Sequence, residues 1–298
     1  MKASQKPEKN AWAVTDQKGH PNSFLASLLK LTRFGNLVII GFAQYFTSTF
    51  LIDRRTVFDY HLLLLSCSTI LIAAAGYIIN DYYDVKIDYI NKPDRVIIGK
   101  SITRRYAILF HVVLSLAGVL IGVYLSWSIT ALNVMSVFLL WLYSNMLKRL
   151  PLVGNLTVAV LTGAAIYSVE ILYRIGNPLV IIFAVFALFI TLVREIIKDI
   201  EDLKGDNTFG CKTLPIILGI RRTKLIIYII IGIFTVIVIA FNHFFKALPF
   251  QYYLLFLFVP LQLLVYRLIR ADTRQDFSLL STFCKVIMLL GILSMAFV

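Results

Sequence analysis

The chain has 298 residues, of which 59% are hydrophobic and 15% are charged, and its formal net charge is +13 at pH 7. Soluble proteins are about 45–50% apolar and about 25% charged, so this composition excludes a soluble enzyme, a disordered protein and a disulfide scaffold. Nucleic-acid binding would use the positive charge, but it would not require so much lipid-compatible surface. A very apolar chain with a basic excess indicates a polytopic membrane protein.

The N-terminal segment differs from the rest of the chain. Residues 1–23 are polar and lack the apolar run of a cleaved signal peptide. We predict that residues 1–23 are a flexible cytosolic leader and that residues 24–298 form a single transmembrane domain.

Nine apolar segments follow, and each is close to the ~20 residues that a helix needs to cross a bilayer. They cover residues 34–52, 62–80, 106–126, 129–147, 155–173, 178–198, 225–243, 250–269 and 279–297. Helices are required because backbone polar groups find no water partner in lipid, and the segments lack the alternation of a transmembrane barrel. The sequence therefore predicts an all-α polytopic membrane protein with about nine transmembrane helices.

The basic residues predict the orientation. If the N-terminus is cytosolic, all but four of the 29 Lys and Arg residues lie on the cytosolic side; the exceptions are Arg54, Arg55, Arg174 and Lys246. This is the asymmetry of the positive-inside rule. We expect the loops after the second, fourth, sixth and eighth spans to be cytosolic and the C-terminus to lie on the opposite side.

Two acidic motifs interrupt these basic loops. The pattern D-x-x-D-x-x-x-D follows the second span as Asp81, Asp84 and Asp88, and it follows the sixth span as Asp199, Asp202 and Asp206. If each motif continues its helix, its three carboxylates share one face and repel one another. Mg²⁺ would offset that repulsion, because it takes oxygen ligands from one or two carboxylates together with substrate phosphates.

A simpler interpretation is that these carboxylates are solvated and pair with basic neighbours. Two copies of one spacing at equivalent helix exits argue against it. A metal-bound diphosphate at the mouth of a cavity within the membrane suggests an allylic isoprenyl diphosphate, whose hydrocarbon tail would lie between the helices. Magnesium would stabilise the leaving diphosphate, and an acceptor would trap the allylic cation.

At these residues the chain resembles the UbiA superfamily of intramembrane prenyltransferases, from about residue 24 to the end. Three stretches carry the resemblance: N-D-x-x-D-x-x-x-D at 80–88 with N-K-P-D-R after it, D-x-x-D-x-x-x-D at 199–206 with T-L-P after it, and Tyr143 followed by Lys148. The chain departs from the family where Val96 replaces a frequent proline and where the spacing from Tyr143 to Lys148 is longer.

The resemblance implies a cavity that opens to the cytosolic side, Mg²⁺ as cofactor, and an isoprenyl diphosphate and a lipophilic acceptor as substrates. The implied metal ligands are Asp81, Asp84, Asp88, Asp199, Asp202 and Asp206, and the implied diphosphate ligands are Asn80, Arg95, Lys148 and Lys198. Asp81, Asp84, Asp202 and Tyr143 are the expected catalytic residues, with Tyr143 steadying the allylic cation.

The acceptor is less constrained. The second motif is most similar to the branch that prenylates geranylgeranylglyceryl phosphate or chlorophyll precursors, and we favour geranylgeranylglyceryl phosphate. Aromatic acids, quinone precursors and tetrapyrroles stay open as acceptors. A cation-coupled transporter is the alternative of another class, and a scaffold without catalysis would not account for the two matched motifs.

Further polar residues have ambiguous roles. His111 and Glu170 lie inside predicted spans, where ionisable groups are functional candidates. Arg33 and Asn36 begin the first span and could line the mouth of the cavity, although we expect Arg33 to be a snorkelling anchor.

Overall fold

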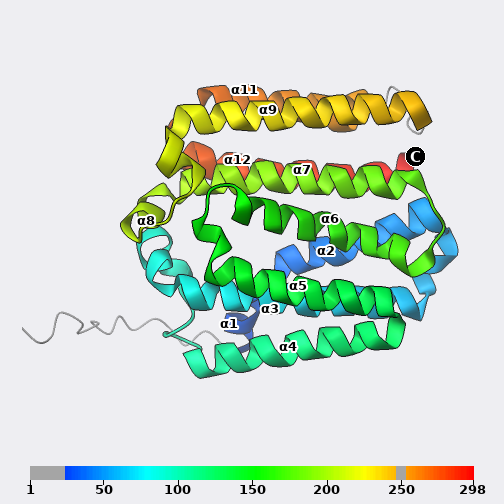
Figure 1. Cartoon of the computed structure of the whole chain (residues 1–298), viewed down its shortest axis with the longest axis horizontal. Helices are drawn as coiled ribbons and strands as arrows, with labels where there is room; N and C mark the ends of the chain where they lie inside the picture. The colour runs from blue at the N-terminus through cyan, green and yellow to red at the C-terminus, as the bar shows by residue number, and fades with distance from the viewer. Residues whose placement is uncertain (1–23, 246–252) are drawn as a thin grey trace, which may run out of the picture.

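A computed structural model describes residues 24–245 and 253–298 of the chain, and these residues are almost entirely helical (Figure 1). The expected leader, residues 1–23, lies outside the described residues. The main α-helices are α1 (Phe24–Leu31), α2 (Phe34–Phe46), α3 (Tyr60–Asn91), α4 (Arg104–Leu125), α5 (Trp127–Asn145), α6 (Val153–Tyr173), α7 (Pro178–Glu201), α8 (Leu203–Thr208), α9 (Leu214–Phe245), α11 (Val259–Arg270) and α12 (Arg274–Ser294). Short 3₁₀ or π turns cover Thr47–Ile52, Arg54–Phe58, Pro93–Arg95, Leu147–Arg149, Tyr253–Phe258 and Met295–Phe297.

Within the described ranges, 8 helices are long and apolar enough to cross a membrane. They correspond to eight of the nine expected segments. The remaining segment, 250–269, corresponds to the turn Tyr253–Phe258 and α11, and its first residues lie outside the described part. The polytopic all-helical fold is therefore confirmed.

Two helices extend beyond their expected bounds on the side of the acidic motifs. Helix α3 continues to Asn91, where Lys92 and Pro93 end it, because the residue before a proline disfavours the helical region. Helix α9 begins at Leu214, and Gly219 interrupts it with a φ of 79°. Glycine tolerates this left-handed conformation, so the chain turns there and then continues as a helix.

Six helices form a ring in the order α2, α3, α5, α6, α7 and α12, with each packed against the next. Helix α4 covers α3 and α5 from outside, whereas α9 and α11 cover α7 and α12 (Figure 1). Helix α7 is the most buried span, because α6, α9 and α12 all pack against it. Gly163 of α6 permits close packing on α7, since an added Cβ would lie 2.9 Å from the Ala184 carbonyl oxygen.

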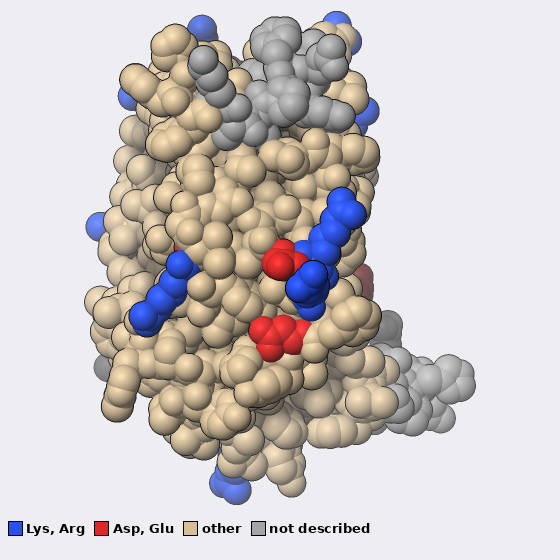
Figure 2. Space-filling model, turned by 90° about the vertical axis from the view of Figure 1, so that its right-hand side faces the viewer, with Lys and Arg blue, Asp and Glu red and all other residues tan. Residues whose placement is uncertain are grey.

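The two ends of the bundle differ in charge. Helix α8 and both acidic motifs lie at one end, and the C-terminus lies at the other (Figure 1). Figure 2 looks onto the end that carries the C-terminus and shows only scattered charged side chains. At the α8 end, the carboxylates of both motifs line one polar cavity.

Candidate active site

Two adjoining cavities lie inside the helix ring. A polar cavity of about 590 Å³ opens near α8, and an apolar cavity of about 250 Å³ lies deeper among the spans. Both are lined by Arg33, Asn36, Asn80, Tyr143, Arg194, Glu195, Lys198 and Lys285. These shared residues mark the boundary where the charged chamber meets the hydrocarbon-like one.

The first acidic motif lies on one continuous helix, as expected. Asp81, Asp84 and Asp88 occupy the last turns of α3 and line the polar cavity. Arg33 donates from Nη2 to Oδ1 of Asp81 at 2.8 Å, and Lys148 donates from Nζ to Oδ1 of Asp84. Cations from outside α3 therefore offset the repulsion between the first two carboxylates.

The second motif is divided. Helix α7 ends at Glu201, Asp202 has the non-helical angles φ −95° and ψ 7°, and α8 begins at Leu203. Asp199, Asp202 and Asp206 thus lie on α7, on the junction and on α8, and the expected single helical face is not formed. All three still line the polar cavity, so the break redirects the chain without removing a carboxylate from the site.

The carboxylates of the second motif have separate environments. Asn155 of α6 donates to Oδ2 of Asp199 at 2.9 Å, and Lys92 forms an ion pair with Asp202 at 2.8 Å. Burial raises the pKa of the Asp206 carboxyl to about 7, and the neighbouring charges of Asp202 and Asp84 act in the same direction. A cation bound beside Asp206 would relieve both effects.

Asn91 connects the two motifs. Its Nδ2 donates to the Asp202 carbonyl at 3.0 Å, and its Oδ1 accepts from the Gly205 amide at 2.9 Å. A Cβ at position 205 would lie 2.4 Å from Nδ2 of Asn91. Glycine therefore permits α8 to approach the end of α3, and this contact holds the second motif against the first.

The cavity has the donor chemistry that Mg²⁺ takes, because carboxylate oxygens surround it and the buried Oδ1 of Asn80 has no hydrogen-bond partner. Among the described residues, no three His, Cys, Asp or Glu side chains converge on one point. This arrangement fits an ion that takes one or two carboxylates and completes its shell with water and substrate phosphates. It does not resemble an all-protein cage.

The structure brings the expected site residues together. The polar cavity is lined by Asn80, Asp81, Asp84, Asp88, Arg95, Tyr143, Lys148, Lys198, Asp199, Asp202 and Asp206. Tyr143 reaches this cavity from α5 and also lines the apolar one. The longer spacing between Tyr143 and Lys148 does not separate them, because the turn Leu147–Arg149 carries Lys148 back toward Asp84.

Arg33 is the residue whose expected role was wrong. In place of a snorkelling anchor, the structure shows a side chain that lines both cavities, pairs with Asp81 and lies 4.9 Å from the centre of the Tyr77 ring. His111 and Glu170 line neither cavity. His111 contacts the Ala75 carbonyl of α3, and Glu170 accepts from the Gly176 amide at the other end of the bundle.

Sequence reasoning missed Glu195, Lys285 and Asn155. Glu195 lies one turn before Asp199 on α7, and Lys285 lies inside the last span. Each is an ionisable group within an apolar segment, and that property alone marks it as a functional candidate. Asn155 carries no comparable mark in the sequence, because only packing of α6 on α7 places it beside Asp199.

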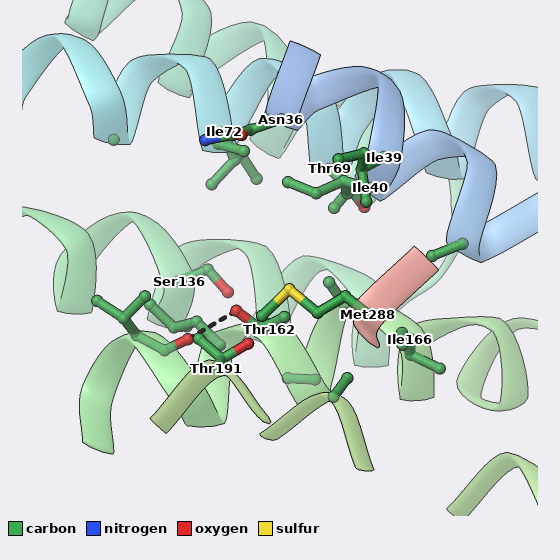
Figure 3. A pocket seen from close by; sticks show the side chains of 18 of the residues that line it. Asn36, Ile39, Ile40, Thr69, Ile72, Ser136, Thr162, Ile166, Thr191 and Met288 are labelled. Atoms are coloured by element: carbon green, nitrogen blue, oxygen red, sulfur yellow. Dashed lines mark hydrogen bonds between the residues drawn. The ribbon is translucent and has the colours of Figure 1, made fainter. Parts of the chain in front are cut away.

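The apolar cavity has apolar and polar side chains on both sides. Ile39 and Ile40 lie on one side together with Thr69, and the hydroxyls of Ser136, Thr162 and Thr191 lie on the other together with Ile166 and Met288 (Figure 3). Ser136 and Thr162 donate to carbonyls of their own helices. The cavity can therefore accept a hydrocarbon chain along most of its wall, with a few hydroxyl groups among the apolar side chains.

Comparisons with known proteins agree with this geometry. The family model described as the UbiA prenyltransferase family matches residues 42–289. Digeranylgeranylglyceryl phosphate synthase from Saccharolobus solfataricus is 32% identical over 91% of this chain and 95% of its own length. The synthase of the same name from Pyrococcus horikoshii is 42% identical, over 55% of this chain and 58% of its own length.

Solved structures show the same fold. A structure of digeranylgeranylglyceryl phosphate synthase in membranes superposes with a TM-score of 0.69, at 26% identity, over 93% of this chain and 98% of that one. A UbiA homologue from Archaeoglobus fulgidus, bound to GPP and Mg²⁺, superposes with a TM-score of 0.65, at 15% identity, over 91% of this chain and 100% of that one. The extent of the family match, together with a relative that is similar over nearly its whole length, shows that this integral membrane chain belongs to the UbiA prenyltransferase family.

Proposed function

We propose that this prenyltransferase uses Mg²⁺ to move a geranylgeranyl group from its diphosphate to the hydroxyl of geranylgeranylglyceryl phosphate. One observation carries the proposal: a carboxylate-lined and cation-lined cavity opens into an apolar cavity within the same helix ring. A prenyl diphosphate has this division between a highly charged head and a long hydrocarbon tail.

The polar cavity would hold the diphosphate and its metal. The carboxylates of the two motifs would bind Mg²⁺, and Arg95, Lys148 and Lys198 would take phosphate oxygens. When bound, the metal supplies positive charge that stabilises the departing diphosphate. Lys148 lies beside Asp84, so its ammonium group can pair with that carboxylate before the substrate binds and with a phosphate oxygen afterwards.

The apolar cavity would hold the prenyl tail and exclude water. The bond between C1 of the prenyl group and the diphosphate oxygen breaks, and the diphosphate keeps the electron pair. The acceptor oxygen forms the new bond to C1, and its proton passes to the diphosphate. Tyr143 lies at the boundary of the two cavities, where its ring can steady the allylic cation. Excluding water prevents hydrolysis of that cation.

The acceptor is inferred from the relatives. The synthases of Saccharolobus solfataricus and Pyrococcus horikoshii bear the name of an enzyme that makes a glyceryl phosphate lipid with two geranylgeranyl groups. An aromatic or quinone precursor and a tetrapyrrole are the alternatives for the acceptor. We also propose that the α8 end, which carries the two motifs, faces the cytosol and that the C-terminus lies on the opposite side.

The experiment is incubation of the purified protein in lipid nanodiscs with Mg²⁺, geranylgeranyl diphosphate and a panel of acceptors, followed by mass spectrometry. We expect the doubly prenylated glyceryl phosphate, no product when EDTA removes the metal, and no product from Asp81→Ala or Asp202→Ala. Product on an aromatic acceptor or a tetrapyrrole alone would replace the proposed acceptor. Substrate flux across liposomes without any product would favour the transporter alternative.

A further inference from the structure

Among the described residues, eight cations line the two cavities; Lys30 and Arg95 line the polar cavity, and the other six fall into two groups. Arg33, Lys148 and Lys92 each form an ion pair with a carboxylate of the acidic motifs. A second group lies where the cavities meet, on the side formed by α7 and α12. Its members are Arg194, Lys198 and Lys285; they line both cavities, as Arg33 does, but none of them pairs with a carboxylate of the acidic motifs.

The second group has too little negative charge of its own. Glu195 is the carboxylate within ion-pair distance of Arg194 and of Lys198. Among residues 24–245 and 253–298, no carboxylate lies within ion-pair distance of Lys285; its Nζ donates to Oδ1 of Asn36 at 3.1 Å. The electrostatic neighbours of Lys285 include Arg194 and Lys198. Like charges held together in a partly buried site repel, and an anion would relieve that repulsion.

An unused polar group lies one helical turn deeper. Thr191 precedes Arg194 by three residues on α7, so the two side chains share a face. Thr191 is 3% exposed, its Oγ1 has no hydrogen-bond partner, and it lines the apolar cavity (Figure 3). The Nε of Arg194 is also buried without a partner. Buried polar atoms are usually hydrogen-bonded, so a ligand with polar atoms at this depth would satisfy both.

The proposed prenyl transfer, on which this inference rests, brings two anions into the protein. The charge of the diphosphate would be neutralised by the carboxylate-bound metal and by the cations of the polar cavity. The acceptor's single phosphate needs a separate cationic site, close enough for its hydroxyl to reach the prenyl carbon. The boundary between the cavities satisfies that condition, because it is also where Tyr143 lies.

We propose that Arg194 and Lys285 bind the phosphate of the lipid acceptor and that Thr191 hydrogen-bonds its glyceryl oxygens. The acceptor's own hydrocarbon chain then follows the apolar cavity wall. Asn36 holds Lys285 in place from α2, so the subsite joins three helices of the ring, α2, α7 and α12.

The test compares two acceptors in nanodiscs: geranylgeranylglyceryl phosphate and geranylgeranylglycerol, which lacks the phosphate. Lys285→Met should raise KM for the phosphorylated acceptor about tenfold to a hundredfold, which is the effect of losing a charge-assisted hydrogen bond. KM for geranylgeranyl diphosphate should stay within about twofold of wild type. Turnover of geranylgeranylglycerol should be equally poor in wild type and variant. Lys285→Arg should restore the phosphorylated acceptor.

Two further variants complete the design. Thr191→Val keeps the shape of the side chain and should raise KM for both acceptors about twofold to tenfold, the effect of one neutral hydrogen bond. Arg222→Gln removes an exposed cation on α9 that lines neither cavity, and it should behave as wild type. Binding of radiolabelled geranylgeranyl diphosphate shows that each variant is folded.

The outcomes separate the two proposals. If the wild type makes product and Lys285→Met has an unchanged KM for the phosphorylated acceptor, the subsite is overturned and the proposed function stands. A rise in KM for geranylgeranyl diphosphate as large as that for the acceptor would assign these cations to the diphosphate and would also overturn the subsite. If the wild type uses neither glyceryl acceptor, the proposed function fails, and this inference fails with it.

Discussion

The two acidic motifs have the same spacing and reach the same cavity on different backbones. The first is carried by uninterrupted α3, with a cation from another element on Asp81 and on Asp84. The second is divided at Asp202 between α7 and α8. The spacing therefore specifies the chemistry of the site, whereas the backbone can present that chemistry in more than one way.

The second motif depends on the first for its position. The position of α3 follows from its long packing surface inside the ring. Helix α8 has only 6 residues, and Asn91 of α3 bonds once to it, at the Gly205 amide, and once to the Asp202 carbonyl just before it. We therefore expect the first motif to be intrinsically rigid and the second to take its position from the first.

Replacing a central carboxylate in either motif should have the largest effect. Asp84→Asn and Asp202→Asn should each lower kcat by about a hundredfold to a thousandfold, the loss seen when one preorganised charge-stabilising group is removed. Equal losses would show that the two backbones contribute equally to catalysis. Steady-state product formation measured by mass spectrometry is the readout.

Asp272→Asn is the matched control, because its side chain is 89% exposed. It should keep wild-type activity. Full activity in Asp84→Asn together with loss in Asp202→Asn would mean that only the second motif serves catalysis, contrary to the shared role expected of the two.

The cations paired with the motifs should have the next largest effect. Lys148 and Asp84 have side chains 10% and 14% exposed, so Lys148→Gln leaves a carboxylate buried without its partner. Losing one member of a buried pair costs about 3–5 kcal/mol. Lys92→Gln should cost at least as much, because Lys92 pairs with both Asp202 and Glu201, whose side chains are 15% and 10% exposed. Thermal unfolding in detergent measures both.

Magnesium provides a second readout for the same pair. If the ion binds at Asp84, adding it should recover part of the stability lost in Lys148→Gln, since a cation then replaces the ammonium. An unfolding midpoint that does not respond to magnesium in this variant would argue against Asp84 as a ligand.

Breaking the link between the motifs should have an intermediate effect. Asn91→Ala removes one hydrogen bond to the Asp202 carbonyl and one from the Gly205 amide. Each buried group left without a partner costs about 1–3 kcal/mol. We expect lower thermal stability and a drop in kcat, because α8 loses its position. Asn207→Ala, at an exposed position on α8, is the control; if it lowered stability as much as Asn91→Ala, the bridging role would be wrong.

Gly205→Ala should have the smallest effect on thermal stability. The added Cβ would lie 2.4 Å from the Asn91 amide, so the two must move apart. Overpacking of this kind costs about 1–3 kcal/mol, and the lower end applies where a single side chain can shift. Gly232→Ala, at an exposed position on α9 with nothing within 4 Å, should instead be neutral or slightly stabilising. Thermal unfolding of the pair, measured side by side, is the check; an unchanged midpoint in Gly205→Ala would mean that α8 does not need this close approach.

Much of the site follows from the order of residues alone. The two D-x-x-D-x-x-x-D motifs, Asn80, Arg95, Tyr143, Lys148 and Lys198 are recognisable in sequence, and all of them line one cavity. The two motifs could be predicted because carboxylates at helical spacing repel one another unless a cation binds them. The roles of Asn80, Arg95, Tyr143, Lys148 and Lys198 are implied by the resemblance to the UbiA superfamily. The role of Arg33 could not be predicted, because a lone Arg at a span terminus has the same sequence context whether it faces lipid headgroups or Asp81.

Hydropathy and charge act on each segment separately, and so the amino-acid sequence is enough to specify a bundle of membrane helices with acidic motifs at one end. Tertiary packing was needed to close six of those helices into a ring, to end α7 at Glu201, and to bring Arg194, Lys285 and Thr191 to the boundary of two cavities. These features depend on which helix faces are buried against one another. That pairing is set by contacts between residues far apart in the chain, and local patterns do not record it.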